Sequence, residues 1–227
     1  MRLALARALT HPISATVREA GWEPVPFFPT EIHPTRQAPP LPPEAAEAVL
    51  VLSPSAAAAA SPWLRPDMVC LATGQGTKEA LGALPLGRPD LEVLTPRKPN
   101  AESLWELLQK RFPRGGEFLL ARGHRSREVL EHLSEGTKWR VHPWITHEEV
   151  IRDPQPPVPE ADALLALSPV QALAMVPIVD GMLRFAWGPG AARIFQEAGV
   201  PADGVCDPDL ASLRKLLETP QLRKSLS

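Results

Sequence analysis

The chain has 227 residues, of which 44% are hydrophobic and 22% are charged, proportions typical of a folded globular protein. Its formal net charge at pH 7 is −2, which excludes a general attraction for nucleic acid or for an anionic membrane surface. No apolar run approaches the roughly 18 residues that a membrane-spanning helix needs. We therefore expect a cytoplasmic enzyme or binding protein, built as one large domain or two modest lobes.

Residue usage adds two expectations. The two cysteines, Cys70 and Cys206, lie in unrelated contexts without a CxxC motif, so we expect both to be buried as small hydrophobic residues. The chain has 28 prolines and no tyrosine, and Asn100 is its only asparagine. Rigid loops and few thermolabile residues suggest a thermophilic source, although a GC-rich genome would produce a similar bias.

Apolar runs alternate with helical segments along the first half of the chain. The predicted strands are residues 3–7, 22–28, 49–52, 68–72 and 91–94, and the predicted helices are residues 13–20, 54–60, 78–84 and 101–112. The prolines of the second strand suit the edge of a sheet. Residues 29–43 are rich in proline and lack a helical period, so we expect a linker there.

One stretch organises this pattern, namely AVLVLSPSAAAAA at residues 48–60. An apolar strand ends at Ser53-Pro54, and an alanine-rich helix follows. Ser53 can cap that helix, Pro54 suits its first turn, and the free backbone N–H groups face the space beyond the strand end. The same strand–Ser-Pro–helix junction occurs a second time in DALLALSPVQAL, where it is formed by Ser168-Pro169.

The second half of the chain repeats the first at a shift of about 115 residues. The strand 118–122 and the helix 127–133, which ends near Gly136, repeat the first strand and helix, and 139–144 matches the second strand. Further on, Ser168 corresponds to Ser53, Gly188 corresponds to Gly74, and the helix 211–217 corresponds to 102–108. Each half therefore reads βα-β-βα-βα-βα, which predicts parallel sheets with helices on both faces.

Ligands of parallel α/β sheets gather outside the carboxyl ends of the strands. The residues that follow the predicted strands are hydroxyls, glycines and arginines, with almost no carboxylates, a set suited to binding anions. These positions are Arg7, Ser53, Thr73, Gly74, Gln75, Gly76, Thr77, Arg97, Arg122, His124, Arg125, Arg127, Thr146, Ser168, Gly188, Pro189 and Gly190.

Simpler interpretations of these residues stay open. Ser53 and Ser168 can serve as helix caps alone, and residues 122–127 can be an ordinary solvated face. The loop TGQGT lacks the lysine of a P-loop and the GxGxxG spacing, which disfavours nucleotide binding. His142 and His147 lack an HExxH motif or a paired cysteine, so no metal is expected, and no GxSxG nucleophile motif is present.

Taken together, the junctions resemble the uroporphyrinogen-III synthase family over almost the whole chain, in order. The segments that carry the resemblance are Ala6-Arg7, Leu52-Ser53, Thr73 to Leu81, Trp144-Ile145-Thr146, Leu167-Ser168-Pro169 and Gly188 to Ala192. The chain departs from the family pattern at three places. Trp144 stands where the family has a tyrosine, Gly190-Ala191 where threonines are usual, and Ala6 where a threonine is usual.

The resemblance implies an α/β fold with two Rossmann-like or flavodoxin-like parallel-sheet lobes, joined by a two-strand linker. One lobe is discontinuous, and the family's active site lies in the cleft between the lobes. Carried over to this chain, lobe 1 is expected to comprise residues 1–33 and 153–227, and lobe 2 residues 38–146. The linkers are then residues 34–37 and 147–152.

The resemblance also implies an activity: a lyase of tetrapyrrole and heme biosynthesis that closes hydroxymethylbilane to uroporphyrinogen III with inversion of ring D. No metal or organic cofactor is expected, and the partners implied are the substrate and a transient contact with hydroxymethylbilane synthase, the chain itself being a monomer. The implied catalytic residues are Trp144 and Thr77. The implied substrate-binding residues are Arg7, Ser53, Thr73, Gly74, Arg97, Arg122, Arg125, Thr146, Ser168, Gly188 and Pro189.

Two other functions are compatible with the sequence. One is a non-catalytic or divergent protein that binds a tetrapyrrole or another polyanion on the same bilobal fold. The other is a sugar-phosphate or nucleotide enzyme on a Rossmann-like fold.

Overall fold

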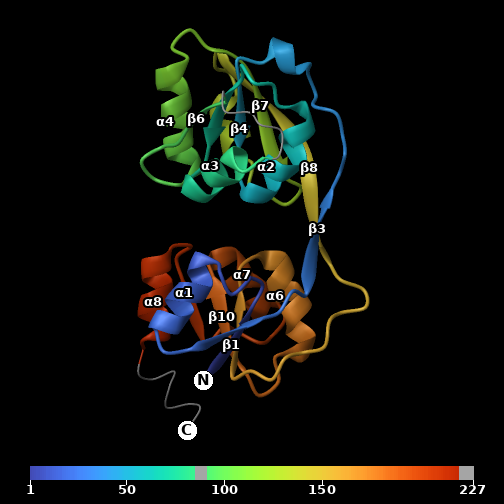
Figure 1. Ribbon diagram of the computed structural model, residues 1–227, viewed down its shortest axis with the longest axis vertical. Helices are drawn as coiled ribbons and strands as arrows, with labels where there is room; N and C mark the ends of the chain where they lie inside the picture. Colours follow the sequence, from blue (N-terminus) through green and yellow to red (C-terminus); the bar gives the residue numbers. More distant parts are fainter. Residues whose placement is uncertain (85–90, 220–227) are drawn as a thin grey trace. The chain divides into compact units, whose positions relative to one another are not determined.

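Two sheets, each covered by helices, organise the chain in the computed structural model, which describes residues 1–84 and 91–219 (Figure 1). The chain divides into two compact units, each described separately below. Unit 1 comprises Met1–Glu31 and Val150–Ser227, and unit 2 comprises Ile32–Glu149. The predicted α/β class with parallel sheets is confirmed, and one unit is discontinuous in sequence.

Unit 1 contains a five-stranded sheet in the order β11-β10-β9-β1-β2, in which all neighbouring pairs are parallel. Its strands are β1 (Arg2–Leu5), β2 (Glu23–Pro26), β9 (Ala163–Ala166), β10 (Leu183–Trp187) and β11 (Gly204–Cys206). Its helices are α1 (Pro12–Glu19), α6 (Pro169–Met175), α7 (Pro189–Glu197) and α8 (Leu210–Leu217), with a 3₁₀ turn at Val176–Ile178. The proline-containing β2 lies at the edge, as predicted. Proline has no backbone N–H to donate, and an edge strand needs donors toward one neighbour only.

The second sheet has six strands in the order β3-β8-β7-β4-β5-β6, and its pairs from β8 to β6 are parallel. The strands are β3 (Thr30–Pro34), β4 (Ala48–Val51), β5 (Val69–Ala72), β6 (Glu92–Leu94), β7 (Gly116–Gly123) and β8 (Trp139–Ile151). The helices are α2 (Pro54–Ala60), α3 (Gln75–Gly82), α4 (Ala101–Arg111) and α5 (Val129–Ser134), with 3₁₀ turns at Pro43–Ala45 and Ser61–Trp63. Within residues 1–84 and 91–219, no helix is both long and apolar enough to cross a bilayer.

The internal repeat appears again in the strand order. Replacing each of β11-β10-β9-β1-β2 by its partner in the repeat gives β6-β5-β4-β7-β8, which is the order of the second sheet without β3. Each sheet therefore combines the first two strands of one half of the chain with the last three strands of the other half. This exchange is why one unit is discontinuous.

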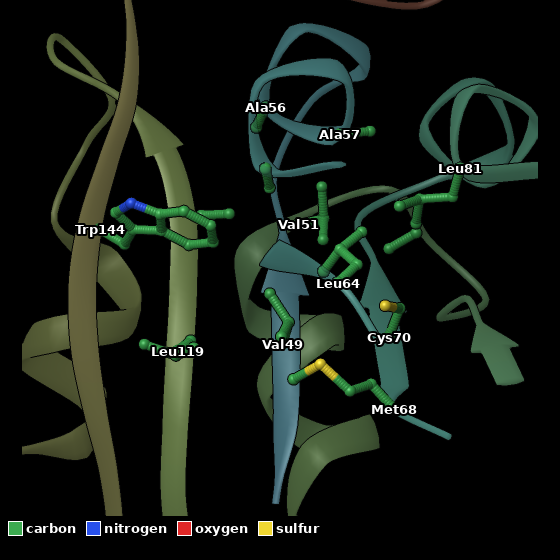
Figure 2. Close-up of a cluster of buried hydrophobic side chains, with 13 residues drawn as sticks. Val49, Val51, Ala56, Ala57, Leu64, Met68, Cys70, Leu81, Leu119 and Trp144 are labelled. Carbon is green, nitrogen blue, oxygen red and sulfur yellow. The ribbon is translucent and has the colours of Figure 1, made fainter. Parts of the chain in front are cut away.

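Alternation along the central strands explains how both faces of each sheet are buried. In β4, Val49 and Val51 pack against α2 and α3, in a cluster that Figure 2 shows, whereas Ala48 and Leu50 pack against α4 and α5. In β9, Leu165 faces α1 and α8, and Leu164 faces α6 and α7. The near-continuous apolar strands seen in the sequence are thus the two-sided strands of parallel sheets.

Two element boundaries differ from the prediction. The expected linker at 29–43 contains the strand β3, which pairs with β8 at the sheet edge, where an extended proline-bearing segment can be accommodated. The strand β8 continues to Ile151, well beyond the predicted end at Trp144.

The helix predicted at 78–84 begins three residues earlier, at Gln75, because Gly74 acts as its N-cap in an extended conformation. Most of the TGQGT segment is therefore the first turn of α3 rather than a loop. Similarly, Pro189 is the first residue of α7, where its missing N–H costs nothing.

Candidate functional site

The carboxyl ends of the parallel strands in unit 2 bring together most of the predicted site residues. Four neighbouring strands, β7, β4, β5 and β6, run in the same direction, so the segments that follow them lie at one edge of the sheet. Those segments carry Ser53, Thr73, Gly74, Thr77, Arg97 and Arg125, whereas Arg122 is near the end of β7 itself and Thr146 lies beside it on β8. The equivalent edge of unit 1 carries Arg7, Ser168, Gly188 and Pro189.

The two repeated serines cap helices. The Oγ atom of Ser53 accepts a hydrogen bond from the N–H of Ala56 at 3.1 Å, and that of Ser168 accepts one from the N–H of Gln171 at 3.1 Å. Each serine has an extended backbone, as expected of an N-cap residue. The cap interpretation of the Ser-Pro junctions is therefore confirmed for both copies.

The two repeated glycines leave the next helices without a side-chain cap. Gly74 precedes α3 and Gly188 precedes α7, and neither helix start has a side-chain hydrogen bond. A Cβ atom at residue 74 would lie 3.0 Å from the Cβ of Pro99, and Gly188 has φ +91°, a value that L side chains rarely adopt. Both positions thus favour glycine, and the first-turn N–H groups stay available for an anion.

The threonines of this edge differ in exposure. The hydroxyl of Thr73 donates to the carbonyl of Val51 at 3.1 Å and is half-buried. Thr77 lies within the first turn of α3 and is only 5% exposed. The hydrogen bond of Thr73 holds the backbone where the chain leaves β5, and the side chain of Thr77 is buried at the start of α3.

The arginine near the end of β7, Arg122, already contacts two carboxylates. Arg122 is 5% exposed, its Nε atom lies 2.7 Å from Oε1 of Glu131, and its Nη2 atom lies 3.2 Å from Oε1 of Glu128. Its Nη1 group donates to the carbonyl of Ser126 at 3.2 Å. A buried guanidinium with this set of partners serves first to hold the chain together.

By contrast, four cations at the same edge are exposed. Arg97 and Lys98 follow β6, and Arg125 and Arg127 follow β7. Among the described residues, none of the four forms an ion pair or a side-chain hydrogen bond. Arginine binds carboxylates through two parallel N–H donors, so this group of cations can receive an acidic ligand without first breaking a contact.

In unit 1, Arg7 lies close to His11, a histidine that no sequence motif singled out. Arg7 is half-buried, and its Nη1 group donates to the carbonyl of Ala6 at 2.7 Å. His11 caps α1 by accepting the N–H of Ile13 on Nδ1 at 3.1 Å. Burial, and then the charge of Arg7, lower the pKa of His11. The only sequence signal for this cap is a histidine directly before Pro12 at a helix start.

The predicted catalytic tryptophan lies in the core of unit 2. Trp144 is 3% exposed and belongs to the cluster that Figure 2 shows, and its ring meets that of Trp63 edge to face at 6.5 Å. Its indole N–H donates to the carbonyl of Gln37 at 3.0 Å. Since indole has a single polar hydrogen, that hydrogen is already used within the chain.

Next to it, Thr146 and His147 form a buried polar pair against the end of β7. The hydroxyl of Thr146 donates to the carbonyl of Arg122 at 3.2 Å, so it accepts from Nδ1 of His147, which lies 3.0 Å away. This assigns the proton of a neutral imidazole to Nδ1. The Nε2 atom faces Gly123, and a Cβ atom at that residue would lie 2.9 Å from it. Burial lowers the pKa of His147, and the charge of Glu149 partly opposes this effect.

The lowered pKa of His147 predicts a pH-dependent stability. The unfolded chain binds the proton more readily than the folded chain, so this contribution to stability is complete above the unfolded pKa of about 6.5 and is lost as the pH falls below it. We expect the urea midpoint of His147→Gln to fall less between pH 7.5 and pH 5.5 than that of the parent. His124→Gln, at an exposed neighbouring residue, is the control, and its urea midpoint should fall between the two pH values as much as that of the parent. If the urea midpoint fell by the same amount in all three proteins, the lowered pKa of His147 would be contradicted.

The two histidines for which the sequence disfavours a metal role, His142 and His147, each contact another side chain. Nε2 of His142 lies 2.5 Å from Oε2 of Glu117, whereas His147 pairs with Thr146. Within residues 1–84 and 91–219, no group of three or more potential ligands could hold a metal ion. The two cysteines are buried as predicted, and burial raises the pKa of Cys70 to about 12 and that of Cys206 to about 11, so neither is a thiolate at neutral pH.

Two surface depressions lie in unit 1, and none of the predicted site residues lines either of them. One of about 310 Å³ is lined by β11 and α8, including Cys206 and Lys215, and the other, of about 430 Å³, lies between α1 and α8.

Three features of these strand ends were not predicted from the sequence: the exposed Lys98, the cap formed by His11 and the polar contact of His147. Lys98 was adjacent to the predicted Arg97, whereas the role of His147 depends on β8 continuing past Trp144.

The chain is similar to proteins of one known family. The family model for uroporphyrinogen-III synthase HemD matches residues 11–214. The crystal structure of uroporphyrinogen-III synthetase from Helicobacter pylori is similar, with a TM-score of 0.64 and 14% sequence identity, covering 100% of this chain and 99% of that one. A mutant uroporphyrinogen III synthase from Thermus thermophilus has a TM-score of 0.51 and 18% identity, covering 100% and 98%. A search of the curated proteins found no match.

Proposed function

Since the chain belongs to the uroporphyrinogen-III synthase family, we propose that it converts hydroxymethylbilane into uroporphyrinogen III and water. The observation that carries this proposal is the family match over residues 11–214. The cations at the carboxyl edge of unit 2 support it, because every pyrrole ring of the substrate carries carboxylate side chains. The alternative of a nucleotide enzyme lacks a comparable observation, since the segment that leads into α3, TGQGTK, does not have the GxxxxGK[ST] spacing of a P-loop.

The reaction requires little acid–base chemistry from side chains. The substrate's hydroxyl group leaves as water after taking up a proton, and the electron-rich pyrroles stabilise the resulting azafulvene cation. A carbon of ring D then forms the closing C–C bond, and the ring system releases one proton, so the net product besides the macrocycle is one water molecule. Inversion of ring D requires that the first bond form at the substituted carbon of ring D, which gives a spiro arrangement. The older bond from that carbon to the ring C bridge then breaks and re-forms at the unsubstituted carbon of ring D, and this carbon releases the proton. The protein's task is to favour this geometry over simple closure.

We assign roles according to which groups are available. Arg97 and Arg125 bind substrate carboxylates, and the N–H groups at the start of α3, after Gly74, donate to further oxygens. In unit 1, the N–H groups at the start of α7, after Gly188, are the equivalent donors. The substrate is oriented at the strand ends by Thr73, Thr77 and Thr146. The starts of α2 and α6 are held by their caps, Ser53 and Ser168. Trp144 supports the middle of β8 rather than donating a proton, because its N–H is bonded to Gln37.

The test is to supply hydroxymethylbilane and separate the isomers formed. Without a catalyst the substrate closes to isomer I, so we expect the protein to shift the product to isomer III and to accelerate its formation. Formation of isomer I alone at the uncatalysed rate would reject the proposal. If the protein still bound uroporphyrin under those conditions, the non-catalytic binding function would replace it.

A further inference from the structure

The arginines that correspond in the two halves of the chain, Arg7 and Arg122, have different surroundings. Arg122 contacts Glu128 and Glu131, one before and one within α5. At a shift of about 115 residues, the corresponding positions in unit 1 are Ile13 and Thr16, which carry no charge. Glutamates at these two positions are therefore specific to the second copy of the segment.

The contacts of Arg122 tie both ends of one short segment together. The guanidinium begins at the end of β7 and reaches the carbonyls of Gly123, at 3.4 Å, and Ser126, at 3.2 Å, as well as the two glutamates. Glu131 is itself largely buried, with a side chain that is 17% exposed. The segment between these anchors, residues 123–128, is held by one charge network.

Two exposed cations lie on that segment. Arg125 and Arg127 have no ion pair or side-chain hydrogen bond with another residue in the described ranges. Two backbone bonds also order the segment, from the N–H of His124 to the carbonyl of His147 at 3.0 Å and from the N–H of Ser126 to the carbonyl of Gly123 at 3.1 Å. An ordered segment presents its arginines to a ligand without paying the entropy of ordering a loop.

We propose that Arg122 is a positioning residue, which, through Glu131 and Glu128, fixes the segment 123–128 so that Arg125 and Arg127 bind the carboxylates of the substrate. This inference rests on the proposed function. It assigns the recognition of acidic side chains to the two exposed arginines, and it gives the buried arginine and its glutamates the task of holding them in place.

The decisive variant is Glu131→Gln, because direct binding by Arg122 and positioning by Arg122 predict opposite signs. If Arg122 bound the ligand itself, removing a carboxylate would release it and strengthen binding of an anion. If it positions the segment, binding weakens. We expect the dissociation constant of uroporphyrin III, measured by fluorescence titration, to rise about tenfold, the equivalent of one charge-assisted hydrogen bond. In turnover assays, KM should rise while kcat is retained.

The matched control is Glu135→Gln, which removes one negative charge just beyond α5 without a side-chain contact to Arg122. Its dissociation constant should stay at the parent value or fall slightly. Glu128→Gln removes the more exposed partner of Arg122 and should weaken binding less than Glu131→Gln, which keeps the test usable if the latter variant folds poorly. Unchanged or tighter binding in both Arg122-partner variants would overturn the proposal.

Amide hydrogen exchange separates this inference from the proposed function. We expect faster exchange at His124 and Ser126 in Glu131→Gln, with the exchange of the central strand β4 unchanged. Exchange at those two amides that equals the parent's would show that Arg122 does not order the segment, and would overturn the proposal. If the parent protein neither converts hydroxymethylbilane nor binds uroporphyrin III, the proposed function fails, and the exchange data alone decide whether Arg122 holds the segment.

Discussion

Replacing Arg125 and Arg127 together by glutamine is expected to raise the KM for hydroxymethylbilane at least about a hundredfold, because each replaced side chain loses a charge-assisted hydrogen bond worth about 1.5 kcal/mol or more. Both side chains are exposed, and neither forms an ion pair within the described part of the chain, so their removal leaves the folded state almost unaffected. The midpoint of thermal unfolding should accordingly change by no more than about 2 °C. Steady-state kinetics and calorimetry on the same preparation measure both quantities.

The matched control for this variant is Arg114→Gln. Arg114 is also an exposed arginine, but it precedes β7 at the opposite, amino-terminal edge of the same sheet. It should leave KM within about twofold of the parent, since a distant exposed charge is screened by salt. Equal effects of Arg114→Gln and the double variant would indicate that net charge, rather than the carboxyl-edge cations, attracts the substrate.

Gly115→Ala is expected to destabilise the protein by about 3 kcal/mol, the largest stability effect predicted here. Gly115 has φ +83° in the turn between α4 and β7, a conformation that L side chains rarely adopt. Its added Cβ would also meet the backbone carbonyl oxygen of Lys138, to which the neighbouring Gly116 donates its N–H at 3.0 Å. Because the obstacle is backbone paired with β7, it cannot move aside as the end of a side chain could.

The matched control is Gly136→Ala. Gly136 has φ +67°, but a Cβ atom there would meet nothing within 4 Å, so only the left-handed backbone opposes the substitution. We expect a loss of about 1 kcal/mol, determined by urea unfolding of both variants. If the two variants lost equal stability, the close approach to Lys138 would carry no energetic weight. Kinetic constants of the surviving folded protein should stay near those of the parent in both cases.

Much of this fold could be predicted from local patterns. Short, unbroken apolar runs such as 48–51 and 163–166 predict strands that are buried on both faces. Each following helix begins at a Ser-Pro pair, Ser53-Pro54 or Ser168-Pro169. Helix starts that depend on a glycine were harder to locate. The N-cap role of Gly74 placed Thr77 inside α3, because glycine has no side chain to mark the cap.

For the candidate site, the sequence predicted the residue types and the strand ends that carry them, but not which cations are available. Arg122 and Arg125 look alike in the sequence, three residues apart and after the same strand. Only the packing of α5 brings Glu131 to within 2.7 Å of Arg122 and leaves Arg125 exposed. Likewise, the burial of Trp144 and its bond to Gln37 join residues 107 positions apart, a contact that no local pattern specifies.

The sequence by itself therefore determined the α/β class, the repeat and the anion-binding character of the strand ends. These follow from periodicity and from side-chain chemistry, which are properties of each segment alone. The tertiary structure decided how the repeat halves exchange strands between the two sheets and which arginines are neutralised by carboxylates. Those outcomes depend on contacts between segments distant in sequence, where burial and ion pairing are set by packing rather than by residue type.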